Sequence, residues 1–467
     1  MSGNKVNFTS LGCPRNLVDS EVMLGILLKA GYEVTESVEA ADYLVVNTCA
    51  FLESSREESK SAIADLLATK KKNAKLIVTG CMVSKHRPEI EQTFPGVHYL
   101  LGSGDMEGIL KAVQSDAQGQ QIGTARSYLE AGEVPRVLST PSHYAYLKIA
   151  EGCRKACAYC IIPKIKGPLR SKSVEQILKE FRSLLAQGVT EIILIAQDLG
   201  DFGKDIGDKK SNKKGSLAPL LREILKMEGD YWLRLLYLYP DEIDDELIQL
   251  MQQEKRLLPY LDMPIQHIND TVLKSMRRTT SALQIKSVIS QLRQKIPDVH
   301  IRTSLIVGFP GETDEQFEEL KTFLQEFPLN HVGIFKYSQE ADTPAGLMEN
   351  QIPEKVKEKR HAQLAAIQHD AVAKLNKAMV GRKIPVVVEA YHPETDLLLV
   401  GRYFGQCPEI DGQVILNDWR KVGSFGERYL VEITDVAGYD LIGKVLGPTK
   451  PATSSKRAKT SLALVFS

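Results

Sequence analysis

Three cysteines near the middle of the chain stand close enough together to bind one metal cluster. Cys153, Cys157 and Cys160 form a C-x-x-x-C-x-x-C pattern. Three thiolates at this spacing can hold three corners of a cubic iron–sulfur cluster, whereas a closed cluster takes four protein ligands. One iron would therefore stay open to a ligand that is not protein, which favours a catalyst over an electron carrier.

Three further cysteines are widely separated in sequence but have similar places in the predicted fold. Cys13, Cys49 and Cys81 each follow the carboxyl end of a predicted strand by only a few residues. A lone cysteine is usually a small buried apolar residue. In an open parallel sheet, however, the carboxyl ends of the strands share one edge, where ligands bind. The pattern therefore favours a second three-thiolate site, whereas Cys407 has no such partner and is interpreted as structural or incidental.

The elements that must position Cys13, Cys49 and Cys81 alternate between strand and helix. Strands are expected at 6–10, 43–47 and 76–79, and Asp19 or Ser20 is expected to cap the first helix. This βαβαβ pattern predicts a parallel sheet with helical crossovers.

Six further strands with helices between them predict a full or partial βα barrel around Cys153, Cys157 and Cys160. These strands are expected near 144–149, 191–195, 232–238, 260–264, 301–307 and 331–335. From about Met379 the pattern becomes period-two alternation with glycine turns, which predicts a small all-β barrel.

The predicted fold class is therefore α/β with three domains. The expected ranges are an N-terminal parallel-sheet domain at 4–114, a linker at 115–138, a central barrel domain at 139–370, a small β-barrel at 373–447 and a basic, disordered tail at 448–467. The charged insertion from Gly203 to Gly215 is expected to be a mobile loop.

Composition narrows the classes of partner and compartment. The 467 residues carry a net charge of +0, which gives no global attraction for nucleic acid or membranes. No apolar run is long enough to span a membrane and the first residues lack a secretory signal, so we expect a cytoplasmic protein with no membrane partner. In that compartment seven cysteines indicate metal ligands or catalytic groups more than disulfides.

These motifs together resemble the radical S-adenosylmethionine methylthiotransferases over most of the chain. The C-x-x-x-C-x-x-C pattern is the signature of radical S-adenosylmethionine enzymes. The segments Asn47-Thr48-Cys49 and Thr79-Gly80-Cys81 match the amino-terminal methylthiotransferase domain. Gly401-Arg402 and Pro408-Glu409-Ile410-Asp411-Gly412 resemble a TRAM domain.

Within that family the chain is most similar to the branch that modifies an aspartate in a protein of the small ribosomal subunit. The transfer-RNA branch typically carries a Tyr-Gly-Cys-Gln-Met-Asn type sequence at the first cysteine, and Gly-Cys-Pro-Arg-Asn-Leu departs from it. The segments that carry the similarity are Leu11–Glu21, Ala196–Asp198, Leu236–Pro240 and Asp262–His267.

The resemblance implies two [4Fe-4S] clusters, S-adenosylmethionine and an electron donor protein. The cluster at Cys153, Cys157 and Cys160 would bind S-adenosylmethionine and yield a deoxyadenosyl radical. The cluster at the other three cysteines would carry sulfur, which a second S-adenosylmethionine methylates. The radical would take hydrogen from the β-carbon of the aspartate, and that carbon would accept the methylthio group.

Four other residues are predicted to contact the cofactor. Tyr159 would pack against adenine or cover the cluster, while Asp198 and Gln266 follow strand ends and are candidates for ribose or amino-group contacts. Gly308 would let backbone approach the nucleoside, or would form a tight turn before a helix. His267 is equally well explained as a packing or capping residue.

The charge of the C-terminal barrel bears on the substrate. Residues 379–447 contain seven Lys or Arg and ten Asp or Glu, a net charge of −3. An acidic barrel is expected to help dock a basic ribosomal protein, with nucleic acid contacted only through the ribosome. Methylthiolation of an adenosine in transfer RNA is the alternative, and an iron–sulfur carrier or scaffold is a remote one, since a carrier would have closed four-cysteine sites.

Overall fold

The computed structural model describes residues 4–123, 135–206 and 217–449. Most of the predicted charged insertion, part of the predicted linker and nearly all of the predicted tail lie outside these residues. Within them, no helix is both long enough and apolar enough to cross a membrane.

The first domain is a six-stranded, fully parallel sheet in the order β2-β1-β3-β4-β5-β6. Its strands are β1 (Lys5–Ser10), β2 (Glu33–Val34), β3 (Tyr43–Thr48), β4 (Lys75–Gly80), β5 (Tyr99–Gly102) and β6 (Gly119–Gln121). Its helices are α1 (Pro14–Lys29), α2 (Glu53–Thr69), α3 (Cys81–Thr93) and α4 (Ile109–Gln114), with the short η1 (Met106–Gly108). The three predicted strands are confirmed, and β6 lies inside the range expected to be linker.

The first helix begins earlier than the sequence pattern predicted. Neither Asp19 nor Ser20 caps it, because α1 starts at Pro14 with Cys13 as the residue before the first turn. Proline fits the first helical position, where its fixed φ is already helical and its missing N–H is not needed. Cys13 itself has extended backbone, and its thiol therefore lies at a helix N-terminus.

The central domain is a partial barrel. Its parallel sheet has the order β14-β13-β12-β11-β10-β7 and stays open between β14 and β7. The strands are β7 (Tyr144–Lys148), β10 (Glu191–Ile195), β11 (Trp232–Leu235), β12 (Leu257–Asp262), β13 (His300–Val307) and β14 (His331–Lys336). A short pair, β8 (Ala150–Glu151) and β9 (Arg170–Ser171), flanks the loop that carries the three clustered cysteines.

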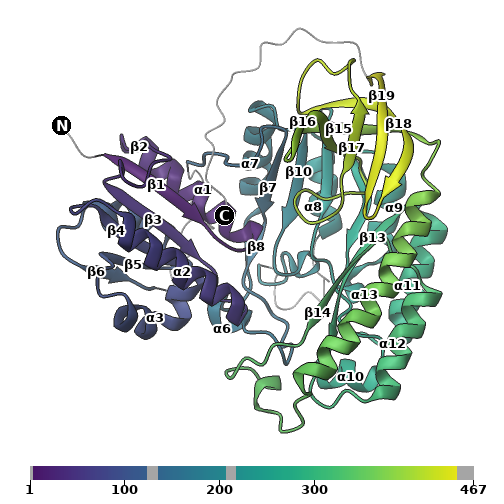
Figure 1. Cartoon of the computed structure of the whole chain (residues 1–467), viewed down its shortest axis with the longest axis horizontal. Coiled ribbons are helices and arrows are strands. Elements are labelled where there is room, and N and C mark those ends of the chain that lie inside the picture. Colours follow the sequence, from purple (N-terminus) through teal and green to yellow (C-terminus); the bar gives the residue numbers. More distant parts are fainter. Residues whose placement is uncertain (1–3, 124–134, 207–216, 450–467) are drawn as a thin grey trace.

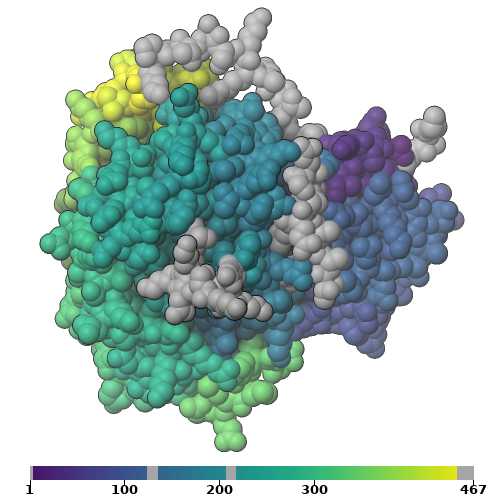
Figure 2. Space-filling model, turned by 180° about the vertical axis from the view of Figure 1, so that it is seen from behind, coloured from purple at the N-terminus to yellow at the C-terminus, as the bar shows by residue number. Residues whose placement is uncertain are grey.

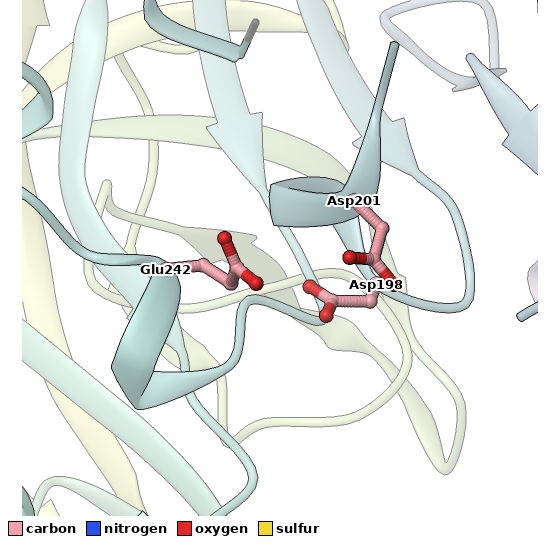
Figure 3. Close-up of side chains that lie close together, drawn as sticks. All are labelled: Asp198, Asp201 and Glu242. Atoms are coloured by element: carbon pink, nitrogen blue, oxygen red, sulfur yellow. The ribbon is translucent and has the colours of Figure 1, made fainter. Parts of the chain in front are cut away.

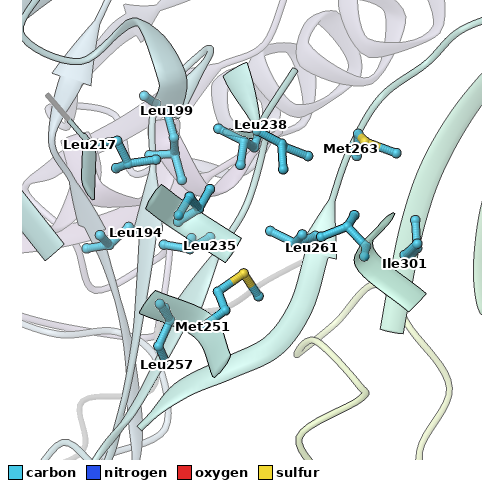
Figure 4. Close-up of a cluster of buried hydrophobic side chains, with 14 of the residues drawn as sticks. Leu194, Leu199, Leu217, Leu235, Leu238, Met251, Leu257, Leu261, Met263 and Ile301 are labelled. Atoms are coloured by element: carbon cyan, nitrogen blue, oxygen red, sulfur yellow. The ribbon is translucent and has the colours of Figure 1, made fainter. Parts of the chain in front are cut away.

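Helices cover the outer face of this sheet. They are α7 (Val174–Ala186), α8 (Leu217–Leu225), α9 (Asp245–Gln253), α10 (Asp270–Ser275), α11 (Ala282–Lys295), α12 (Asp314–Glu326) and α13 (Glu354–Lys377). The short α6 (Ile162–Lys166) instead packs against α3 of the first domain. The short turns η2 (Leu199–Asp201), η3 (Pro240–Glu242) and η4 (Ala345–Leu347) follow strand ends or loops. The apolar layer between sheet and helices, which includes Leu194, Leu235 and Leu261, is the largest core of the molecule (Figure 4).

The last domain is a closed five-stranded barrel in the order β15-β16-β17-β19-β18. Its strands are β15 (Lys383–His392), β16 (Thr395–Arg402), β17 (Val414–Asp418), β18 (Glu427–Ala437) and β19 (Asp440–Pro448). The N-terminal sheet lies beside the partial barrel and the closed barrel lies at one end of it (Figure 1). From behind, the N-terminal domain forms a separate lobe next to the larger body (Figure 2).

Candidate active site

The sheet brings the three dispersed cysteines to one edge. Cys13 follows β1, Cys49 directly follows β3, and Cys81 directly follows β4 as the first residue of α3. Cys49 and Cys81 are buried, and both lie close enough to Cys13 for its negative charge to raise the pKa of their thiols. The predicted convergence of these three side chains is therefore what the fold produces.

Close backbone approach and one asparagine hold the three loops together. Gly12 has φ +89° and a Cβ there would lie 2.8 Å from the Cβ of Cys49, so a side chain at this position would push the loops apart. The Asn16 amide donates to the carbonyls of Leu11 (3.2 Å) and Thr48 (3.0 Å), and its oxygen lies 3.6 Å from the Cys81 thiol. Asn16 thus ties the loop of each cysteine to the other two.

The thiols of this first site differ in their pKa values. Burial raises the pKa of Cys81 to about 12, and the nearby Lys166 only partly opposes this. Burial also acts on Cys13, but the Arg15 guanidinium and the backbone N–H of Asn16 bring the pKa of its thiol below the ordinary value. Cys13 is therefore the thiol of this set that ionises most readily.

The second set lies on one loop, which three distant segments anchor. The Cys153 N–H donates to the Gly167 carbonyl (3.2 Å), and the Ala158 N–H donates to the Met276 carbonyl (2.9 Å). The Ala158 carbonyl accepts from the N–H of Ala345 (2.9 Å). These contacts fix both ends of the loop, so its cysteines are held in place although the loop has no regular structure.

Aromatic and basic side chains surround this second site. Burial raises the pKa of Cys153 to about 11 and that of Cys160 to about 12. The Cys157 thiol lies 3.5 Å from the Tyr239 hydroxyl, and the Arg278 guanidinium lies 3.9 Å from the centre of the Tyr239 ring. The site therefore combines one buried and two half-buried thiols with a fixed cation.

The two cysteine sets lie on segments of the two domains that pack against each other. Helix α6, which starts two residues after Cys160, packs against α3, which starts at Cys81, and Ile161 and Ile165 join the apolar cluster around Cys81. Arg15 lies between the sets, because its charge acts on the thiols of both Cys13 and Cys160.

A buried group of four charged side chains joins the two domains beside these sites. Lys148 pairs with Asp19 of α1 and with Glu151 (2.8 Å), while Lys166 pairs with Glu151 (2.8 Å) and Asp19 (3.4 Å). None of these side chains is more than 4% exposed. Removing one member would leave an uncompensated buried charge, so the group strongly favours this one arrangement of the domains.

A cavity of about 710 Å³ opens between the two domains, within the usual size range of ligand sites. Arg15 and the segment from Phe51 to Ser54 line it from the N-terminal domain. Cys153, Tyr159, Cys160 and residues after the carboxyl ends of the barrel strands line it from the other side. Cys153 and Cys160 thus line the cavity, whereas the N-terminal set borders it through Arg15 and Phe51, two residues after Cys13 and Cys49.

Two of the predicted cofactor contacts, Tyr159 and Gln266, line this cavity. Gln266 has φ +70°, a conformation that a residue with a side chain rarely adopts, and its backbone bonds to Ser304 and Ile306 of β13 (2.8 Å each). Such strain is often found where a ligand must be held.

Asp198 has a different neighbourhood from the one expected. Its carboxylate points toward those of Asp201 and Glu242 (Figure 3), and Lys155 and Lys204 already pair with these three acids. Burial, followed by the charge of Asp201, raises the pKa of Asp198 to about 7. Since Lys155 belongs to the cysteine loop, Asp198 anchors that loop, and its neighbour Gln197 is the residue that lines the cavity.

Gly308 and His267 have structural surroundings. Gly308 has φ +71°, donates to the Glu312 carboxylate (2.6 Å), and a Cβ there would lie 2.3 Å from Cγ of Lys357. Of the two roles predicted for Gly308, this geometry is that of the tight turn before a helix. The described lining of the cavity does not include Gly308. His267 accepts from the N–H of Asn269 (3.0 Å) through Nδ1, which is a local cap.

Sequence reasoning missed four residues of the site. Three of them line the cavity: Arg15, Gln197 and Tyr237. The fourth, Asn16, joins the cysteine loops through its hydrogen bonds. Both amide atoms of Gln197 are buried without a hydrogen-bond partner among the described residues, which makes it a candidate ligand contact. Arg15 and Asn16 stand in the quoted segment after Cys13, but nothing in their spacing showed which loops they would reach.

The C-terminal barrel packs at the end of the partial barrel opposite the cavity. Buried ion pairs join Arg402 to Glu191, the first residue of β10 (2.9 Å), and Asp411 to Arg302 (3.5 Å). The Glu409 carboxylate accepts from the Tyr144 hydroxyl (2.7 Å). Part of the charge counted in the sequence is therefore paired at this junction.

Three parts of the chain match known domain families. Residues 5–102 match Uncharacterized protein family UPF0004, residues 147–324 match the Radical SAM superfamily, and residues 380–446 match the TRAM domain. A solved structure of the radical S-adenosylmethionine methyltransferase TsrM from Kitasatospora setae is similar in fold, with a TM-score of 0.54 and 15% identity. That similarity covers 74% of this chain and 77% of the other.

Curated relatives are much closer. The ribosomal protein uS12 methylthiotransferase RimO of Protochlamydia amoebophila is 65% identical over 444 residues, which is 95% of this chain and 93% of the relative. The protein of the same name from Chlamydia pneumoniae is 58% identical over 459 residues, covering 98% and 97%. The chain therefore belongs to the ribosomal protein uS12 methylthiotransferase family of radical S-adenosylmethionine enzymes.

Proposed function

We propose that the protein transfers a methylthio group to the β-carbon of an aspartate in ribosomal protein uS12, using two [4Fe-4S] clusters and S-adenosylmethionine. One observation carries this proposal: Cys153 and Cys160 line a cavity whose other wall includes Arg15 and Phe51, each two residues after a cysteine of the N-terminal set. A carrier or scaffold of clusters has no need for a shared cavity, whereas a transfer reaction requires both sites to reach one substrate atom.

The residues present suit two clusters with three protein ligands each. All six cysteines are free thiols, and none is joined in a disulfide. Burial raises the pKa of four of them, Cys49, Cys81, Cys153 and Cys160, so these ionise only when a metal replaces the proton. Arg15 beside the first set and Arg278 beside the second are fixed positive charges that compensate buried thiolates.

When bound, the cluster at Cys153, Cys157 and Cys160 would supply the electron that cleaves S-adenosylmethionine into a radical able to remove hydrogen from a saturated carbon. A general base cannot easily do this next to a carboxylate, because a second negative charge would form beside the first. The protein supplies position and a water-poor surrounding. We assign nucleoside contacts to Gln197, Gln266 and Tyr159, and Tyr239 covers the Cys157 side of the site.

Docking of uS12 by the C-terminal barrel belongs to the proposal and is supported by charge. Of the ten acids counted there, Glu389, Glu409 and Asp411 contact the central domain. Three of the seven bases do so too, through ion pairs with acids of that domain: Arg382, Arg402 and Arg428. Four bases and seven acids remain, so the net charge away from the junction is still −3. This part of the barrel is thus acidic, which suits a basic ribosomal protein.

The proposal is tested by anaerobic reconstitution with iron and sulfide, followed by incubation with S-adenosylmethionine, a reductant and either small ribosomal subunits or transfer RNA. Mass spectrometry is expected to find one methylthio group on an aspartate of uS12. Modification of transfer RNA alone would instead support the adenosine reaction. Recovery of one cluster per chain would contradict the two-cluster assignment.

A further inference from the structure

Arg15 presents a positive charge inside the cavity between the two cysteine sets. It lies in the first turn of α1, two residues after Cys13. One guanidinium nitrogen, Nη1, donates to the Ala196 carbonyl at the end of β10 (2.8 Å), and the Cζ atom lies 4.8 Å from the centre of the Tyr237 ring. These contacts, together with a hydrogen bond to the Cys13 sulfur, fix the orientation of the guanidinium while using few of its five N–H donors.

Four of the other five charges of the cavity differ from Arg15 in having ionic partners. Six charged side chains line the cavity: Arg15, Lys336, Glu53, Asp262, Glu340 and Glu354. Lys336 pairs with Glu354 (2.5 Å), Glu340 pairs with Arg56 (2.7 Å) and Asp262 pairs with Arg302 (3.0 Å).

Among residues 4–123, 135–206 and 217–449, no carboxylate forms an ion pair with Arg15. A planar guanidinium that is held in place, faces a cavity and lacks a carboxylate partner is well suited to bind a carboxylate through two parallel hydrogen bonds. The pairing of Lys336 with Glu354 makes the second cation of the cavity a weaker candidate.

We propose that Arg15 binds the side-chain carboxylate of the substrate aspartate, an inference that rests on the proposed function. The β-carbon is one bond from that carboxylate, so a carboxylate held at Arg15 leaves the β-carbon between the two cysteine sets. Arg15 thereby positions the reacting carbon and selects an acidic side chain over a neutral one.

Binding of purified uS12 to the reconstituted enzyme without reductant tests the role of Arg15 apart from turnover. We compare uS12 that carries aspartate or asparagine at the modified position, using titration calorimetry. Wild-type enzyme is expected to bind the aspartate form about tenfold to a hundredfold more tightly, the usual range for a charge-assisted hydrogen bond. R15M is expected to bind both forms equally, and R15K to show an intermediate ratio.

Lys336→Met provides the matched control, because it removes the other lining cation. It is expected to change the affinity for both forms of uS12 by the same factor and to leave their ratio unchanged. If Arg15 served only to compensate the Cys13 thiolate, R15M would likewise weaken both forms equally and keep the wild-type ratio, which would overturn the proposal.

The outcomes separate this inference from the function on which it rests. Equal binding of both forms by wild-type enzyme overturns the role of Arg15, even if uS12 is methylthiolated. Absence of both binding and methylthiolation of uS12 overturns the proposed function itself. Should R15M lose iron or its cooperative melting transition, the wild-type ratio and that of R15K decide the question.

Discussion

The two cysteine sites each bring three thiols together, but they are assembled from the chain in different ways. The site of Cys13, Cys49 and Cys81 is assembled from three strand ends, and it exists only when β1, β3 and β4 pair in register. The site of Cys153, Cys157 and Cys160 is local in sequence, and its loop is held by anchors such as Gly167 and Met276. The first site therefore depends on sheet topology, whereas the second depends on a few loop contacts.

Removing one ligand from each site is the strongest test of this contrast. Cys157→Ala is expected to abolish cleavage of S-adenosylmethionine, whereas Cys49→Ala is expected to retain cleavage and lose methylthio transfer. Each variant should keep about half of the wild-type iron, because the other three-cysteine site remains. Iron analysis and separate assays of deoxyadenosine and methylthiolated uS12 measure this. Loss of all iron in either variant would show that the sites do not assemble independently.

The placement of the sites opposite each other depends on the buried charges, and Asp19→Ala tests it. This change leaves Lys148 and Lys166 with one carboxylate instead of two, which costs about 3–5 kcal/mol in the free energy of unfolding. The control is Asp42→Ala, which removes a partly exposed pair with Lys71 and is expected to cost about 1 kcal/mol or less. Equal losses in urea unfolding would mean that the buried group does not hold the domains together.

The junction with the C-terminal barrel provides a comparison away from the thiols. Burial alone would raise the pKa of Glu389, but Arg402 and His143 bring it to about 2, below its ordinary value of 4.5. A lowered carboxyl pKa stabilises the fold above pH 4.5, and this stabilisation is lost as the pH falls toward 2. Wild type is expected to lose roughly 3 kcal/mol more than Glu389→Gln over this range. Parallel stability curves for the two proteins would contradict this.

The smallest expected effect separates two neighbours at the end of β10. Gln197→Ala is expected to raise the concentration of S-adenosylmethionine needed for half-saturation about tenfold, with iron content unchanged. Asp198→Asn is instead expected to lower the iron retained at Cys153, Cys157 and Cys160. It weakens the ion pair with Lys155 that holds the cysteine loop. Identical effects of the two substitutions would remove the distinction between ligand contact and loop anchor.

The sequence allowed the three domains and both cysteine sets to be predicted, because each rests on a local pattern. Hydrophobic periodicity located the strands, and the strand ends located the cysteines. The sequence pattern could not assign Asp198 and Gln197 to their roles, since adjacent residues after a strand point in different directions. The sequence also could not show which charges of the C-terminal barrel pair at the junction, because the contacts of Glu389 and Asp411 depend on tertiary structure.

The most direct test of the central claim is anomalous diffraction at the iron edge from crystals of the anaerobically reconstituted protein. Two iron sites are expected, one bound by Cys13, Cys49 and Cys81 and the other by Cys153, Cys157 and Cys160, both open to the cavity that Arg15 lines. A single iron site, or a cluster closed by a fourth protein ligand, would contradict the account.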